Sequence, residues 1–137
     1  MNTLFLRTVG CSIIPFYEQA VSNAPDDYYA LFSRAQCFEG LGEKSEAKEG
    51  FAVALKAIEQ SGHIEKKREL TTHALITCLA AQCAIRSFNS DVAPRYIQQA
   101  RGLLERKLSF NGMEPHFFSP STKRIVSAAE LLDESQS

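Results

Sequence analysis

The feature that most constrains the fold is a pair of amphipathic helices predicted between Tyr28 and Gln60. Apolar residues recur every three or four positions in the first helix, at Leu31, Ala35, Phe38 and Leu41. Gly40 and Gly42 interrupt this run and predict a turn. The same spacing returns in the second helix, at Ala47, Phe51, Ala54, Leu55 and Ile58. Because small residues alternate with bulky ones, two antiparallel helices can approach closely here.

This pattern resembles the tetratricopeptide repeat family, whose first helix carries a large residue, a small residue and an aromatic, and whose second helix carries Ala-x3-Phe. Leu31, Ala35 and Phe38 occupy the first-helix positions, and Gly42 lies in the turn. The second-helix positions are matched by Ala47, Phe51 and Ala54. Arg34 departs from the family's leucine, and no proline closes the unit. The resemblance covers one unit well.

The resemblance implies an all-α fold, a right-handed α-α superhelix of about three helical hairpins, or around six helices, with a C-terminal capping helix. We expect a single domain over residues 1–137. Its expected parts are an N-terminal segment (1–12), a partial repeat (13–27), the clear repeat (28–62), a degenerate extended repeat (63–108), a loop (109–118) and the capping helix (119–133). The extended repeat is predicted to hold one long helix from Ile64 to Ser87 and another from Val92 to Leu108. Ser119 is the expected cap of the last helix, and Phe117 and Phe118 are expected to fold back onto the helices.

The composition excludes several classes of protein. The chain has 137 residues, 45% of them hydrophobic, and a formal net charge of -1, so it has no global attraction to nucleic acid or anionic membranes. No apolar run approaches the roughly 18 residues of a membrane span. The four cysteines lack metal-binding spacing, which favours buried thiols in a reducing compartment. Residues 1–12 weakly resemble an organelle transit peptide, although an ordinary N-terminal segment is favoured. An intracellular, cytoplasmic location is therefore predicted, with a mitochondrial one as the alternative.

The sequence shows no constellation of residues typical of an enzyme or metal site. His73, Cys78 and Cys83 are each five residues apart, so they point in different directions on a helix and do not converge on one metal ion. His63 follows a glycine at a helix end, and His116 lies in the predicted loop. No motif for a nucleophile, a zinc protease or a phosphate loop is present. We therefore predict no catalysis and no cofactor.

In the resembled family, the first helix of each pair lines a concave groove that receives a peptide or helix of a partner. The groove residues implied for this chain are Tyr29, Phe32, Ser33, Gln36, Glu39, Leu75, Cys78, Leu79, Gln82 and Arg86. Tyr29 and Phe32 are candidate aromatic anchors. Alternatively, the last helix or the N-terminal segment fills this groove. The basic clamp with which some family members bind chaperone tails is missing, since Phe32, Ser33, Gln36 and Gly40 occupy those positions.

These observations predict a non-catalytic protein–protein interaction module, an adaptor or scaffold subunit within a larger assembly. The partial first repeat is consistent with this assignment, because its apolar residues Ile13, Ile14 and Tyr17 need to be covered, either by residues 4–9 or by a partner protein against this N-terminal helix face. The alternatives are an accessory subunit of a mitochondrial complex and a helical-repeat RNA-binding factor. The basic cluster at 66–68 is interpreted as a solvated face, so nucleic acid is disfavoured as a partner. Basic residues on the concave side would favour the RNA-binding factor, whereas aromatic and aliphatic residues there would favour the adaptor.

Overall fold

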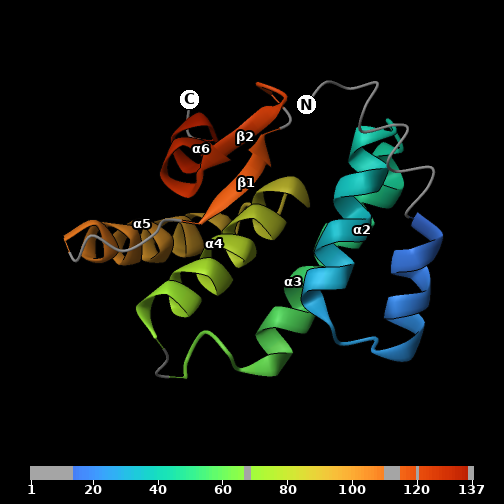
Figure 1. The fold of residues 1–137 in the computed structure, drawn as a ribbon, viewed down its shortest axis with the longest axis horizontal. Coiled ribbons are helices and arrows are strands. Elements are labelled where there is room, and N and C mark those ends of the chain that lie inside the picture. Colours follow the sequence, from blue (N-terminus) through green and yellow to red (C-terminus); the bar gives the residue numbers. More distant parts are fainter. Residues whose placement is uncertain (1–13, 67–68, 110–114, 120, 136–137) are drawn as a thin grey trace.

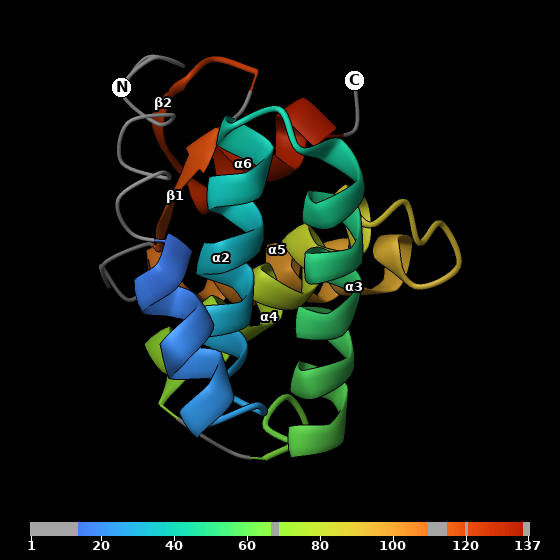
Figure 2. The same cartoon turned by 90° about the vertical axis from the view of Figure 1, so that its right-hand side faces the viewer.

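The computed structural model describes residues 14–66, 69–109, 115–119 and 121–135, and most of these residues are helical (Figure 1). Residues 14–23 form a helix that lies beside the next one (Figure 2). The following elements are α2 (Tyr28–Gly40), α3 (Lys44–Ser61), α4 (Leu70–Arg86), α5 (Ala93–Ser109), β1 (His116–Ser119), β2 (Arg124–Ser127) and α6 (Ala128–Ser135). The mainly helical fold is confirmed, with a short β-hairpin added. The predicted segment 1–12 lies outside the described residues.

The predicted central hairpin is confirmed as α2 and α3, which run side by side (Figure 2). Asp27 begins α2, because its carboxylate oxygen Oδ1 accepts hydrogen bonds from the N–H groups of Tyr29 and Ala30 at 3.1 and 3.3 Å. The two helices approach closely at Gly50. A Cβ atom added there would lie 2.9 Å from the Cβ of Ala35, which is shorter than any ordinary contact. The hairpin therefore requires the absence of a side chain at position 50.

The second hairpin, α4 and α5, lies across the first (Figures 1 and 2). The prediction that its first helix begins at Ile64 is wrong, since α4 begins at Leu70. Gly62 ends α3 with a left-handed φ of 67°, and the next residues form turns. The physical reason is that 65–69 is a charged run with no apolar face to bury, whereas α4 has buried residues through most of its length.

The C-terminal region is the main correction to the sequence-based prediction. Residues 116–118 of the predicted loop and the predicted cap Ser119 form β1, and residues 124–127 of the predicted capping helix form β2. The strands pair antiparallel, with Phe117 opposite Val126 and Phe118 opposite Ile125. Val126 is 2% exposed, whereas Ile125 is 52% exposed. This alternation is the period of a strand, and both residues are β-branched, which favours strands. Only Ala128–Ser135 is helical.

Ser119, the predicted cap of the last helix, instead ends β1 and is fully buried. Its hydroxyl donates to Oε2 of Glu134 in α6 at 2.7 Å, which links the hairpin to the final helix. The turn between the strands is closed by the N–H of Lys123, which donates to the carbonyl of Ser119 at 2.7 Å. A further link is the ion pair between Arg101 of α5 and Asp133 of α6, also at 2.7 Å. The hairpin and α6 thus form one C-terminal unit against α5.

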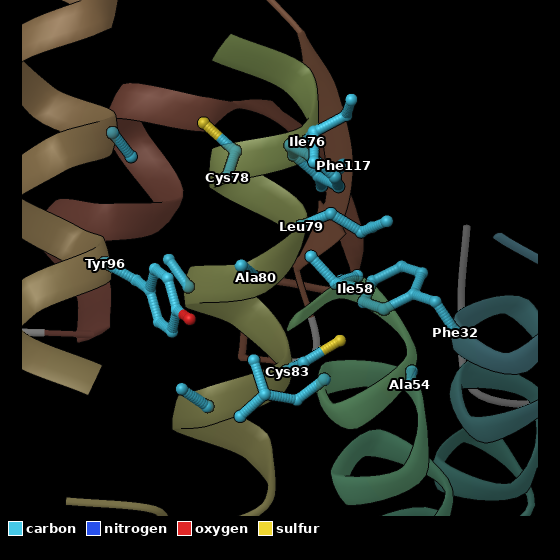
Figure 3. Close-up of a cluster of buried hydrophobic side chains, with 14 of the residues drawn as sticks. Phe32, Ala54, Ile58, Ile76, Cys78, Leu79, Ala80, Cys83, Tyr96 and Phe117 are labelled. Atoms are coloured by element: carbon cyan, nitrogen blue, oxygen red, sulfur yellow. The ribbon is translucent and has the colours of Figure 1, made fainter. Parts of the chain in front are cut away.

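The α2–α3 hairpin, the α4–α5 hairpin and the C-terminal unit all contribute to one hydrophobic core. Figure 3 shows Phe32 from α2, Leu79 from α4 and Phe117 from β1 in this cluster, together with Ile58 from α3. The chain was predicted to fold Phe117 back onto the helices, and this is confirmed by its burial against Phe32. The side chain of Phe118 lies outside the described part of the structure. The fold is therefore held by contacts between hairpins as well as within them.

Candidate functional site

The residues of the predicted groove divide into a buried and an accessible set. Phe32, Cys78, Leu79 and Gln82 are buried in the core. Tyr29 is 43% exposed, and Ser33, Gln36, Glu39 and Leu75 are half-buried. Arg86 keeps only 6% of its side chain exposed. The structure brings α2 and α4 into one core, but most of the apolar surface predicted for a partner is already covered.

The covering element is the C-terminal β-hairpin. The Phe117 ring of β1 meets the Phe32 ring edge-on, with 6.4 Å between the centroids. Phe32 in turn packs edge-on against Phe51 of α3 at 5.5 Å. The sequence left open whether the last helix or the N-terminal segment fills the groove. Among the described residues, strand β1 rather than the last helix contacts Phe32, and the N-terminal segment 1–12 lies outside the described residues.

A buried polar cluster joins α2 to the end of α4. The guanidinium carbon of Arg86 lies 5.6 Å from the centroid of the Phe32 ring and 5.3 Å from that of Phe51. Its Nη1 atom is 3.6 Å from Oε1 of Glu39. Burial raises the pKa of Glu39, and the positive charge of Arg86 partly opposes this shift. Burial likewise lowers the pKa of Arg86, while Glu39 and Cys83 act in the opposite sense. Because Arg86 is buried and contacts α2 and α3, we interpret this cluster as one that stabilises the packing of α4 on the first hairpin.

The cysteines do not supply a reactive thiol in this region. Cys37, Cys78 and Cys83 are buried thiols, and none of them forms a disulfide within the described residues. Burial raises the pKa of Cys83 to about 12, so its sulfur stays protonated at neutral pH. Because the thiolate is the nucleophilic form, Cys83 behaves as a small apolar residue. Cys11 lies outside the described residues.

The turn between α4 and α5 has an unusual residue at its centre. Phe88 is 76% exposed and adopts a left-handed φ of 59°. The N–H of Phe88 donates to the carbonyl of Ile85 at 3.1 Å, and the N–H of Asn89 donates to that of Ala84 at 2.9 Å. These two bonds define a Schellman motif, in which the left-handed position is usually glycine. A large aromatic side chain is therefore exposed to solvent at a residue whose left-handed backbone conformation is unfavourable for phenylalanine.

The ring of Phe88 also has a charged neighbour. The Nζ atom of Lys48, in the first half of α3, lies 5.4 Å from the centroid of the ring. This contact orients the aromatic ring against the first hairpin without burying it. The sequence indicated only that residues 88–90 form a turn. A signal for the exposed aromatic was present, since phenylalanine stood where a helix end normally carries glycine, but sequence alone does not show that the ring faces water.

A pocket lies on another part of the second hairpin, next to the connection between α3 and α4. Its volume is about 430 Å³. The lining residues come from this connection, from α4 and from α5: Ile64, Glu65, His73, Thr77, Gln99, Gly102, Leu103 and Arg106. Sequence reasoning missed this site, because its residues are spread over three segments and follow no known motif.

The histidines have separate environments. The ring nitrogen Nδ1 of His63 shares a hydrogen bond of 2.8 Å with the hydroxyl of Tyr28. His73 lines the pocket, and His116 is exposed on β1. Within the described ranges, no three His, Cys, Asp or Glu side chains are grouped so that they could hold a metal ion. Every helix in that part of the chain also falls short of what crossing a bilayer requires.

Comparison of the chain with protein-family models, with curated proteins and with solved structures gives no match.

Proposed function

We propose that this chain is a non-catalytic, tetratricopeptide-like adaptor that binds a protein partner within a larger assembly. The observation that carries the proposal is Phe88, an aromatic residue exposed in a left-handed turn. A non-glycine residue in this conformation costs about 1–2 kcal/mol. Its ring adds little burial to the fold in return. Aromatic residues, phenylalanine among them, are enriched in protein interfaces relative to the rest of the surface.

The residues of the predicted groove, on α2 and α4, favour the adaptor over the RNA-binding alternative. Arg86 is the only basic residue among the ten predicted groove residues of α2 and α4, and apolar members of this set such as Phe32 and Leu79 are buried. The basic residue Arg86 is buried there and lies beside Glu39, so it offers no accessible positive charge to a phosphate backbone. In this proposal the partner binds at the α4–α5 turn, because Phe117 of β1 already packs on Phe32 of the predicted groove.

The substitution Phe88→Gly should affect folding stability and partner binding differently. The substitution removes strain of about 1–2 kcal/mol and loses an exposed cation–π contact of about 0.5–1 kcal/mol. The variant should therefore fold at least as stably as the wild-type protein but lose its partner. Because stability and binding change in opposite directions, loss of binding cannot be attributed to unfolding.

The test uses a photo-reactive phenylalanine analogue at position 88, irradiated in an extract of the native cells. A matched control carries the analogue at Phe16, which is also an exposed aromatic residue. We expect one protein adduct specific to position 88. Excess unlabelled wild-type protein should compete for that adduct, whereas excess Phe88→Gly protein should not. The proposal fails if the two positions label the same proteins, or if the Phe88→Gly protein competes as well as the wild type.

A further inference from the structure

We propose that the pocket beside α4 and α5 binds a small organic zwitterion, with its carboxylate at Arg106, its ammonium group at Glu65 and its apolar body against Leu103. This site is distinct from the α4–α5 turn that carries Phe88. It therefore does not depend on the proposed partner, and each proposal can fail without the other.

Gly102 is the first argument for a binding site. It lies in the interior of α5, where glycine destabilises a helix by roughly 0.5–1 kcal/mol relative to alanine. A Cβ atom added at Gly102 would meet nothing within 4 Å, so helix packing does not require the absence of a side chain. The missing side chain instead leaves space in the wall of the pocket. We interpret this glycine as the residue that keeps the pocket wide.

The size and the apolar wall of the pocket are the second argument. A volume of about 430 Å³ falls within the range of roughly 300–1,000 Å³ that is usual for small-molecule sites. Leu103 is buried and Ile64 is half-buried, which gives the pocket an apolar side. The amide of Gln99 supplies a neutral hydrogen-bonding group. A mainly apolar wall with a few polar groups is the usual composition of such a site.

The charges of the lining define the chemical class of ligand. Glu65 and Arg106 are both exposed and of opposite sign. Among the described residues, neither of them takes part in an ion pair. Their formal charges cancel, so the lining has no preference for a simple anion or a simple cation. A molecule with separate positive and negative groups can interact favourably with both side chains, whereas a singly charged molecule gains from only one.

The test compares three probes with the same body: L-phenylalanine, 3-phenylpropionate and 2-phenylethylamine. The second lacks the ammonium group, and the third lacks the carboxylate. A parallel set with an isobutyl body consists of L-leucine, 4-methylpentanoate and 3-methylbutylamine. Titrations at neutral pH are followed by backbone amide NMR shifts on α4 and α5. In at least one set, the zwitterion should bind about tenfold more tightly than either singly charged analogue, because one charge-assisted contact is lost in each.

Variants assign each charge to its residue. Arg106→Gln should reduce the affinity for the zwitterion to that for the amine, and Glu65→Gln should reduce it to that for the carboxylate. Gly102→Leu should abolish binding of all probes by filling the pocket. Arg95→Gln is the matched control, since Arg95 is an exposed arginine on the same helix that does not line the pocket. It should leave every affinity unchanged.

The amide spectrum of each variant shows directly whether it is folded, so loss of binding is read only from folded protein. The proposal is overturned if no probe of either body shifts these resonances. It is also overturned if the three probes of each set bind equally, or if a folded Gly102→Leu protein still binds them. Equal loss of affinity in Arg95→Gln and Arg106→Gln would likewise contradict it.

Discussion

The two helical hairpins have the same turn motif but carry different residues at its left-handed position, Gly42 in the first and Phe88 in the second. At the end of α2, the N–H of Gly42 donates to Glu39 at 3.1 Å and the N–H of Glu43 donates to Phe38 at 2.9 Å. The end of α4 repeats this pattern of hydrogen bonds, with Phe88 in place of Gly42. Both residues are left-handed, with φ of 82° and 59°. The first hairpin therefore follows the local rule, and the second departs from it.

The glycines within the second helix of each hairpin differ in the same way. Gly50 of α3 is required by contact with Ala35, whereas Gly102 of α5 faces open space. In the first hairpin, the backbone conformation explains Gly42 and the packing explains Gly50. In the second, neither Phe88 nor Gly102 is explained in that way. Departures from local rules without a gain in packing are expected at functional sites, so the second hairpin is where we place function.

The largest expected effect is loss of the central side chain of the first hairpin. Phe51 is fully buried, and Phe51→Ala should lower the free energy of unfolding by about 3–5 kcal/mol. Leu103 of α5 borders the pocket, so Leu103→Ala should cost only about 2 kcal/mol, at the low end of such substitutions. Denaturant unfolding measures both values. Equal losses would remove the contrast in packing between the hairpins.

A smaller loss is expected at the seam between α2 and α3. Gly50→Ala should destabilise the protein by about 1–3 kcal/mol, because the new methyl group would overlap with Ala35. The intrinsic helix preference for alanine acts in the opposite direction. The double variant Gly50→Ala with Ala35→Gly should recover part of the loss by restoring space. An additive loss in the double variant would show that the contact does not limit the approach of these helices.

The turn of the first hairpin should be sensitive to the chemistry that the second turn tolerates. Gly42→Ala should cost about 1–2 kcal/mol, since alanine is disfavoured at positive φ. A shift in the midpoint of thermal or denaturant unfolding measures this cost. Phe88→Gly should shift the same midpoint in the opposite direction. If both substitutions move the midpoint in the same direction, the two turns are not equivalent in the way proposed.

Gly102→Ala should give a modest gain in stability. Alanine is favoured in a helix by about 0.5–1 kcal/mol over glycine, and the added methyl group meets no neighbour. The same glycine-to-alanine substitution should therefore stabilise the protein at position 102 of α5 and destabilise it at position 50 of α3. A loss of stability at position 102 would mean that the glycine has a structural role after all.

The smallest effect concerns pH and the cluster that joins the hairpins. Burial raises the pKa of Glu39, so the native state binds its proton more readily than the unfolded chain does. This contribution to stability is present below the ordinary glutamate pKa of about 4.3 and is lost as pH rises through the raised value. The stability of the wild type minus that of Glu39→Gln should thus fall as pH increases. Glu49→Gln, at an exposed site on α3, is the control for a glutamate-to-glutamine change outside this cluster.

The sequence predicted the first hairpin well because its signals are local. Residues within three or four positions of one another specify both helices, and Gly42 specifies their turn. Partner binding at the predicted groove stays a prediction, but Phe32 and Leu79 in it are buried, because such apolar residues suit either a partner or a core. Their fate depended on Phe117, a residue 85 positions beyond Phe32 in the chain. No local pattern reports such a contact.

By itself, the amino-acid sequence determined the helical class, the α2–α3 hairpin and the apolar character of the α2 and α4 faces, since periodicity and turn residues act over short distances. Only the tertiary structure decided that residues 116–119 and 124–127 pair as strands, because the pairing is stabilised by burial of Phe117 and Val126 in a core supplied by distant helices. The exposure of Phe88 and the space beside Gly102 were decided in the same way. Both depend on which surfaces the packed hairpins cover and which they leave open to solvent.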